Sequence, residues 1–271
     1  MDGRWTLVGT GFYVSGDGLF ITARHVIDEI LRDGEQIAPL VILHPHSDTG
    51  LFGPSQVLFR PIGQCWLAAN GGDVAFGVAA TCTNNATGKV LQHWSWPLSW
   101  DPPAVGSRIG TYAFPRHLMS EGGHLTFAPE LYTGSVLNTG DYRDRIIVPF
   151  PYLEMDCRVH GGASGGPIAA TGGAVVGVNC TELSQSIDHP PGPAYGAQIR
   201  CLRDAFFDNG ILSGEENPRR ISFDELVLAG HLRVQGYVPR DPAKPLSGTL
   251  VRLDKILATA RHPKIGFIQY S

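Results

Sequence analysis

The chain has 271 residues, 43% of them hydrophobic, and a formal net charge of −4. The hydrophobic content argues against disorder, and the charge argues against a broadly basic surface for nucleic acid. No apolar run reaches the roughly 18 residues that cross a membrane, so no membrane span is expected. The 34 glycines and 20 prolines follow no Gly-X-Y period, which excludes collagen, and they exclude a helical bundle over most of the length.

Short apolar runs alternate with turn signals along residues 5–200, which predicts an all-β fold. Asp17-Gly18 between two apolar runs predicts the first hairpin. One short helix is expected at residues 25–32, directly after a strand. The predicted strands are residues 8–14, 19–23, 40–43, 55–61, 74–79, 108–114, 131–137, 145–149, 166–170, 174–178 and 194–199.

The pattern changes near residue 205, where a boundary is predicted. A short helix is expected over residues 202–209, and Ser222 with Glu225 three residues later forms a capping box that predicts a helix to about Gly230. Four apolar residues at helical spacing predict another helix: Leu250, Leu253, Leu257 and Ala260. We therefore expect residues 206–271 to form a C-terminal extension containing helices, with a linker at residues 215–220.

The N-terminal residues lack the apolar stretch of a signal peptide, so a cytoplasmic location is expected. The five cysteines contain no CxxC pair and predict reduced thiols. The His44-Pro45-His46 segment could suggest a metal, but no third and fourth ligands converge in the sequence, and a surface loop is favoured. No metal and no cofactor are expected.

Three segments carry the chemistry. His25 follows a predicted strand in Thr-Ala-Arg-His, Asp73 precedes another in Gly-Asp-Val-Ala-Phe, and Ser164 lies in Gly-Gly-Ala-Ser-Gly-Gly-Pro. Taken singly, each has an ordinary structural explanation: a satisfied core or surface histidine, a turn aspartate and a flexible glycine loop. The glycine loop is not a phosphate-binding P-loop, because no Gly-Lys-Ser/Thr follows it.

Together the three segments resemble the chymotrypsin-like serine peptidases, especially the bacterial HtrA-type and trypsin-like peptidase branch. The match covers residues 11–26, 73–75 and 162–167 in the family's chain order, with Ala163 in place of the usual Asn. The resemblance spans roughly residues 5–200. It implies an all-β fold of two antiparallel six-stranded barrels, the first at about 5–95 and the second at about 105–200, within a peptidase unit of residues 1–205.

The resemblance implies a serine endopeptidase that acts on a protein or peptide substrate. Ser164 would be the nucleophile, His25 the general base and then acid, and Asp73 the group that orients His25. The glycines suit this chemistry, because a turn without Cβ atoms can direct backbone N–H groups at an oxyanion. The expected donors are the amides of Gly162 and Ser164. Cys157 also lies near this turn, but upstream of its glycines, so the nucleophile is assigned to Ser164.

The substrate pocket is predicted from alignment with the family. Arg158 falls where the family places a residue at the floor of the pocket, which would suit an acidic substrate side chain. The alternative is an arginine that points to solvent or pairs with Asp156. His160 could contribute in the same way. Cys180 falls on the strand that would pair with the substrate backbone, where a small structural residue is common.

Two further hypotheses concern regulation by the C-terminal extension and an absence of catalytic activity. The C-terminal extension could dock a regulatory protein partner or simply pack on the barrels, and it lacks the Gly-Leu-Gly-Phe-type loop of a carboxylate-binding domain. A catalytically silent chymotrypsin-like binding module or scaffold is the alternative to an enzyme. Such modules usually lack at least one triad residue, whereas all three are present here.

Overall fold

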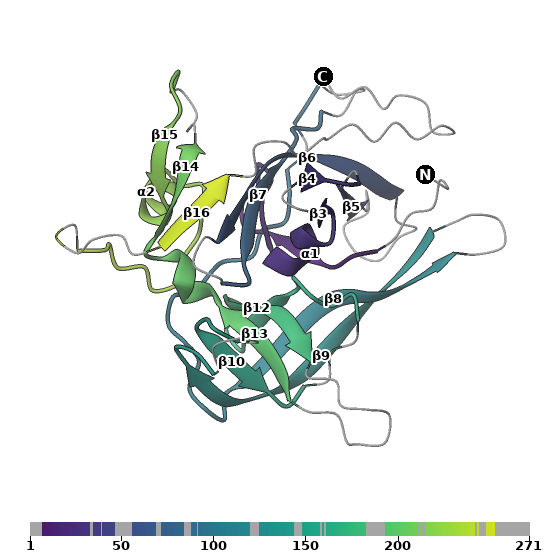
Figure 1. The fold of residues 1–271 in the computed structure, drawn as a ribbon, viewed down its shortest axis with the longest axis vertical. Helices are drawn as coiled ribbons and strands as arrows, with labels where there is room; N and C mark the ends of the chain where they lie inside the picture. The colour runs from purple at the N-terminus through teal and green to yellow at the C-terminus, as the bar shows by residue number, and fades with distance from the viewer. Residues whose placement is uncertain are drawn as a thin grey trace.

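Strands dominate the fold (Figure 1). The structure is a computed structural model. None of the helices in its described part is long and apolar enough to span a membrane. The structure describes residues 7–32, 35–38, 40–46, 56–68, 72–83, 88–90, 92–119, 125–143, 148–157, 159, 161–182, 193–210, 212, 215–241, 243 and 248–252.

One half of the molecule is a closed antiparallel barrel of six strands, in the lower part of Figure 1. Its interior is filled by aliphatic side chains such as Ile109, Leu153 and Ile168, none more than 4% exposed. The predicted second barrel is therefore confirmed. In order around the barrel, its strands are β10 (Tyr152–Met155), β13 (Ala194–Gln198), β12 (Val175–Glu182), β11 (Pro167–Ala170), β8 (Arg108–Met119) and β9 (Leu125–Gly140).

The other half is an eight-stranded sheet in which a block of N-terminal strands is extended at one edge by a block of C-terminal strands. The path begins with β1 (Gly11–Tyr13), β2 (Leu19–Thr22), β7 (Ala75–Ala79) and β6 (Gln56–Ala68), and continues with β16 (Gly248–Arg252), β14 (Ala205–Gly210) and β15 (Arg219–Ser222). β5 (Val41–His46) pairs with β6 outside this path, and β3 (Leu31–Arg32) pairs with β4 (Glu35–Gln36) in a separate hairpin.

This sheet corrects the prediction of a first six-stranded antiparallel barrel built from residues 5–95. In the described part of the chain it is an open half-barrel, because its path ends at β1 and β15 without a pairing between them. Three of its strands come from the region beyond residue 205, and β14 runs parallel to β16. β16 pairs antiparallel with β6, where Leu250 faces Ala68.

The C-terminal region contains more strand than the sequence predicts. The expected helix at residues 202–209 is wrong: a 3₁₀ turn, η1 (Ile199–Leu202), leads into β14, whose Phe206 and Phe207 are buried by pairing with β15 and β16. Leu250 likewise belongs to a strand, and Leu253, Leu257 and Ala260 lie outside the described residues. Tertiary pairing overrides local helical spacing here.

The capping-box helix is confirmed as α2 (Phe223–Leu228). The Ser222 hydroxyl accepts a hydrogen bond from the Glu225 amide, and the Glu225 carboxylate accepts one from the Ser222 amide. The other helix, α1 (Arg24–Asp28), is shorter than the predicted 25–32, because Leu31 and Arg32 are in β3. Of the expected strand at 145–149, residues 145–147 lie outside the described residues, and Val148 and Pro149 lie in no strand; β10 follows at Tyr152.

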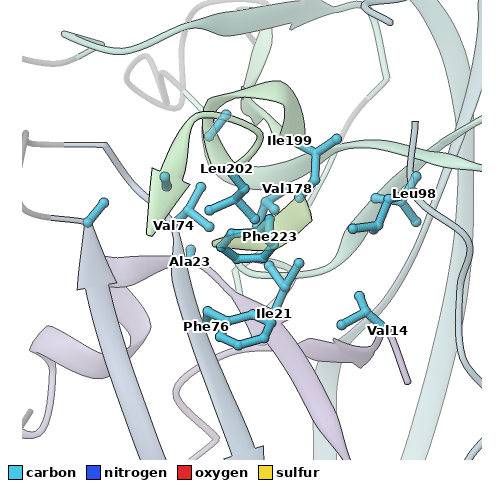
Figure 2. Packing of buried hydrophobic residues seen from close by; sticks show 14 of the residues in the cluster. Val14, Ile21, Ala23, Val74, Phe76, Leu98, Val178, Ile199, Leu202 and Phe223 are labelled. Atoms are coloured by element: carbon cyan, nitrogen blue, oxygen red, sulfur yellow. The ribbon is translucent and has the colours of Figure 1, made fainter. Parts of the chain in front are cut away.

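One hydrophobic cluster joins the two halves and the C-terminal region. Figure 2 shows Phe223 of α2 among Ile21, Val74 and Phe76 of the open sheet and its lead-in loop, with Val178 of the barrel beside it. The Phe223 ring centroid lies 5.0 Å from that of Phe76. The segment beyond residue 205 is thus part of the core that supports β7 and the loop before it.

Candidate active site

His25 and Asp73 are brought together by two adjacent elements of the open sheet. His25 is in the first turn of α1, directly after β2, and Asp73 precedes β7, which pairs with β2. The His25 Nδ1 atom lies 2.8 Å from Asp73 Oδ2, and the His25 amide donates to Asp73 Oδ1 at 2.9 Å. Both carboxylate oxygens therefore hold the same residue, which fixes the ring and its backbone together.

The electrostatics of the pair follow from this geometry. The hydrogen bond to Asp73 raises the pKa of His25 above its usual value and outweighs the opposing effect of burial. For Asp73, burial acts to raise the pKa, but the hydrogen bonds from the His25 ring and amide outweigh it and hold the pKa below its usual value. Asp73 is thus an ionised partner for a histidine of increased basicity.

Ala68 at the end of β6 keeps the loop of Asp73 in place. Its amide donates to the Val74 carbonyl oxygen at 3.2 Å, and its carbonyl oxygen accepts from Arg24 Nη1 at 2.7 Å. The neighbours of His25 and of Asp73 are therefore tied to one residue. β16 pairs with that residue from the other side, through Leu250.

Ser164 lies in a tight turn between Val159 and β11. Gly162 and Gly165 in this turn have φ values of 91° and 86°, which favour glycine. A Cβ atom on Gly165 would overlap the Thr10 carbonyl oxygen and the Thr22 hydroxyl and come close to the Ala23 amide. The turn therefore lies directly against the segment that leads into His25.

The Ser164 side chain has a defined partner in this structure. Its hydroxyl donates to the Cys180 carbonyl oxygen at 3.1 Å, and among the described residues no hydrogen bond joins it to the His25 ring. A Ser164–His25 hydrogen bond is thus not formed in this arrangement. Such contacts are often long or absent in the unliganded state of an enzyme and form with substrate.

The two backbone amides expected to bind an oxyanion are available. Within the described residues, neither the Gly162 N–H nor the Ser164 N–H donates a hydrogen bond to the protein. The carbonyl groups around them are engaged: Gly166 donates to the Ala163 oxygen at 3.0 Å, and Thr10 donates to the Ser164 oxygen at 2.7 Å. The turn thus has engaged carbonyl groups, and its Gly162 and Ser164 N–H groups have no acceptor among the described residues.

Of the three predicted pocket residues, the structure describes only Cys180. Cys180 of β12 is 3% exposed, and its thiol donates toward the Asp73 carbonyl oxygen at 3.7 Å. Burial raises the pKa of this thiol well above its usual value. The side chain therefore packs beneath Asp73, while the carbonyl group of the same residue faces Ser164. Arg158 and His160 lie outside the described residues, so their role as pocket residues stays a prediction.

Other chemically active side chains that the sequence singles out have structural explanations. Cys157 is buried, and desolvation raises the pKa of its thiol to about 11, so it is held as a thiol. His44 packs in an aromatic group with Tyr13 and His93, and the side chain of His46 lies outside the described part. Within the described residues, no group of three or more His, Cys, Asp and Glu side chains is arranged to hold a metal.

Sequence reasoning missed Thr10. Its backbone and side chain contact the turn of Ser164 across the interface between the two halves. The Gly-Thr-Gly spacing around it was visible, but a threonine before a strand has no distinctive signature.

Comparison with known proteins decides the family. A model of the trypsin-like peptidase domain matches residues 9–178, a range that includes His25, Asp73 and Ser164. The chain belongs to the trypsin-like peptidase domain family. The resemblance read from the three sequence segments is thereby confirmed. No curated protein is significantly similar to the chain.

Solved structures of HtrA-type proteases resemble this trypsin-like peptidase domain at low identity. A variant of the HtrA-type protease AlgW with a decapeptide has 14% identity and a TM-score of 0.49, over 73% of this chain and 49% of that one. AlgW itself with a decapeptide has 17% identity and a TM-score of 0.46, over 71% and 48%. The chain therefore spans about half the length of these structures.

Proposed function

We propose that the protein is a serine endopeptidase in which Ser164, His25 and Asp73 form the catalytic triad. The observation that carries the proposal is the double contact of Asp73 with His25, together with a glycine turn around Ser164 that has two open amides and lies against the segment before His25. We further propose that the fold is of the chymotrypsin type, in which each half of the molecule supplies part of one site. His25 and Asp73 would come from the first half and Ser164 from the second.

The proposed reaction is acyl transfer to Ser164 and then to water. His25 Nε2 accepts the hydroxyl proton as Ser164 Oγ attacks the peptide carbonyl carbon, and the amides of Gly162 and Ser164 bind the resulting oxyanion. The intermediate expels the amine, which takes the proton from His25, and an ester on Ser164 remains. A water molecule then attacks this ester, with His25 again as base, and restores the free hydroxyl.

The alternative is a catalytically silent binding module of the same fold. The hydrogen bond from Ser164 Oγ to the Cys180 carbonyl is the observation that favours it, because the hydroxyl is not directed at His25. Against it stand the intact dyad and the unobstructed amides, which a binding module has no need to keep. Hydrolysis assays separate the two readings.

The C-terminal region bears on the proposed regulation. Its described residues pack into the core through Phe207 and Phe223, which favours a structural role over a free docking arm. A regulatory protein partner that binds residues 206–271 would then act by changing how this region packs against the core beside Asp73, and would not bind a detached tail.

The test is hydrolysis of a quenched fluorescent peptide library by the wild-type protein, with Ser164→Ala and His25→Ala as matched variants. We expect cleavage by the wild type and a loss of at least about 10³-fold in both variants. Wild-type rates in the Ser164→Ala variant would contradict the proposal. The same library reads the pocket: a preference for Asp or Glu would support Arg158 as its floor, and a preference for Lys or Arg would contradict that role.

A further inference from the structure

Thr10, in the first half of the molecule, makes two hydrogen bonds to the Ser164 turn. It directly precedes β1 and is 6% exposed. Its amide donates to the Ser164 carbonyl oxygen at 2.7 Å, and its hydroxyl donates to the Gly162 carbonyl oxygen at 2.9 Å. A single residue thus holds carbonyl groups on both sides of Ala163.

The direction of the hydroxyl is set by a third contact. Thr10 Oγ1 accepts a hydrogen bond from the Phe114 amide of β8 at 3.1 Å, which leaves its one proton for the Gly162 carbonyl oxygen. The Thr10 carbonyl oxygen in turn accepts from Thr22 Oγ1 at 2.7 Å. Hydrogen bonds to β2 and β8 therefore fix Thr10, independently of its contacts with the turn.

These contacts act on the peptide units that flank the proposed oxyanion site. The Gly162 carbonyl belongs to the unit that follows the Gly162 amide, and the Ser164 carbonyl belongs to the unit that follows the Ser164 amide. A turn rich in glycine can rotate its peptide units at little cost, because no Cβ atom opposes the rotation. The Gly162 carbonyl group lies in the peptide unit that joins the two units carrying the Gly162 and Ser164 N–H groups, so holding it and the Ser164 carbonyl group fixes the chain between and after these two N–H groups.

We propose that the Thr10 hydroxyl is a positioning group that holds the Ser164 turn with the Gly162 and Ser164 amides convergent. The inference rests on the proposed peptidase function. Thr10 itself does not contact the reacting atoms; it acts through the turn. The role belongs to the side chain, since any residue except proline would supply the backbone amide.

The experiment compares Thr10→Val, which keeps the shape and loses the hydroxyl, with Thr10→Ser, which keeps the hydroxyl. Ser15→Ala is the control. Ser15 is 2% exposed, follows the same strand, and also donates one hydrogen bond and accepts one, to Asp17 and from Leu19, away from the turn. The readouts are kcat and KM for a cleaved peptide, together with the Tm of each variant.

We expect Thr10→Val to lower kcat by about tenfold to a hundredfold with KM within about threefold, because oxyanion stabilisation acts in the transition state. Thr10→Ser should restore kcat to within about threefold of wild type. Ser15→Ala should lower Tm without lowering kcat. Thr10→Ala replaces Thr10→Val if the valine variant does not fold.

Three outcomes would overturn the inference while leaving the proposed function intact. They are a wild-type kcat in Thr10→Val, equal losses in Thr10→Val and Thr10→Ser, or an equal loss in Ser15→Ala. A folded wild-type protein that hydrolyses no peptide and reacts with no fluorophosphonate would overturn the proposed function, and the inference with it.

Discussion

Asp73 holds His25 through both of its carboxylate oxygens, one on the ring Nδ1 at 2.8 Å and one on the backbone amide at 2.9 Å. The arrangement sets the ring orientation and leaves Nε2 free to exchange a proton. It also gives the proposed base a raised pKa, with the hydrogen bond to Asp73 as the largest cause. The first consequence is a pH dependence with a defined sign.

Activity should fall as the pH is lowered through the pKa of His25, because only the neutral ring can accept the Ser164 proton. The pKa is raised above 6.5, so the acid midpoint of kcat/KM should lie above that value. Asp73→Asn removes the largest cause of the shift and should move the midpoint down, with a loss of about 10⁴-fold in kcat. A reactive ester substrate makes both profiles measurable. A midpoint unchanged by Asp73→Asn would contradict this account.

Gly165 should be the least replaceable glycine of the nucleophile turn. Gly165→Ala introduces a Cβ atom at a φ of 86° and against the Thr10 carbonyl, so we expect a loss of about 3 kcal/mol or more in the free energy of unfolding. Gly161→Ala in the same turn has open space around its Cβ and should change that free energy by less than about 0.5 kcal/mol. Urea unfolding of the two variants makes the comparison, and equal stabilities would show that the turn is not packed as described.

Residues beyond 205 should be needed for folding. Phe223→Ala removes a fully buried ring from the shared core, and we expect a loss of about 3–5 kcal/mol. Leu228→Ala on the same helix is the control, because Leu228 is 71% exposed and should be nearly neutral. A chain truncated near residue 205 should be insoluble or unfolded by circular dichroism. A soluble, stable and equally active truncated chain would refute a structural role for the C-terminal region.

A serine nucleophile also predicts resistance to thiol reagents. Four of the five cysteines have raised pKa values because of burial: Cys65, Cys157, Cys180 and Cys201. Iodoacetamide should therefore leave the peptidase activity of the folded protein unchanged. Loss of activity that Cys157→Ser prevents would instead indicate a thiol nucleophile and contradict the assignment to Ser164.

The sequence predicts the chemistry of this protein better than its C-terminal architecture. His25, Asp73 and Ser164 could be named as site candidates because their three segments resemble those of the chymotrypsin-like serine peptidases in type and chain order. The strand β14 could not be predicted, because Phe206 and Phe207 form a strand only by pairing with β15 and β16. The sequences of these two partner strands carry no clear strand pattern, and β16 is distant along the chain. Leu250 shows the same limit, since its helical spacing is overridden by pairing with Ala68. Thr10 escaped notice because its role depends on three contacts made across the fold.

The most direct test of the central claim is the site of covalent labelling by a fluorophosphonate probe, located by mass spectrometry of the digested protein. The account predicts one adduct, on the peptide that contains Ser164, which is absent in a folded Ser164→Ala variant and strongly reduced in His25→Ala. An adduct on another residue, or equal labelling of Ser164→Ala, would contradict the account. A folded wild-type protein without any adduct would favour the silent binding module.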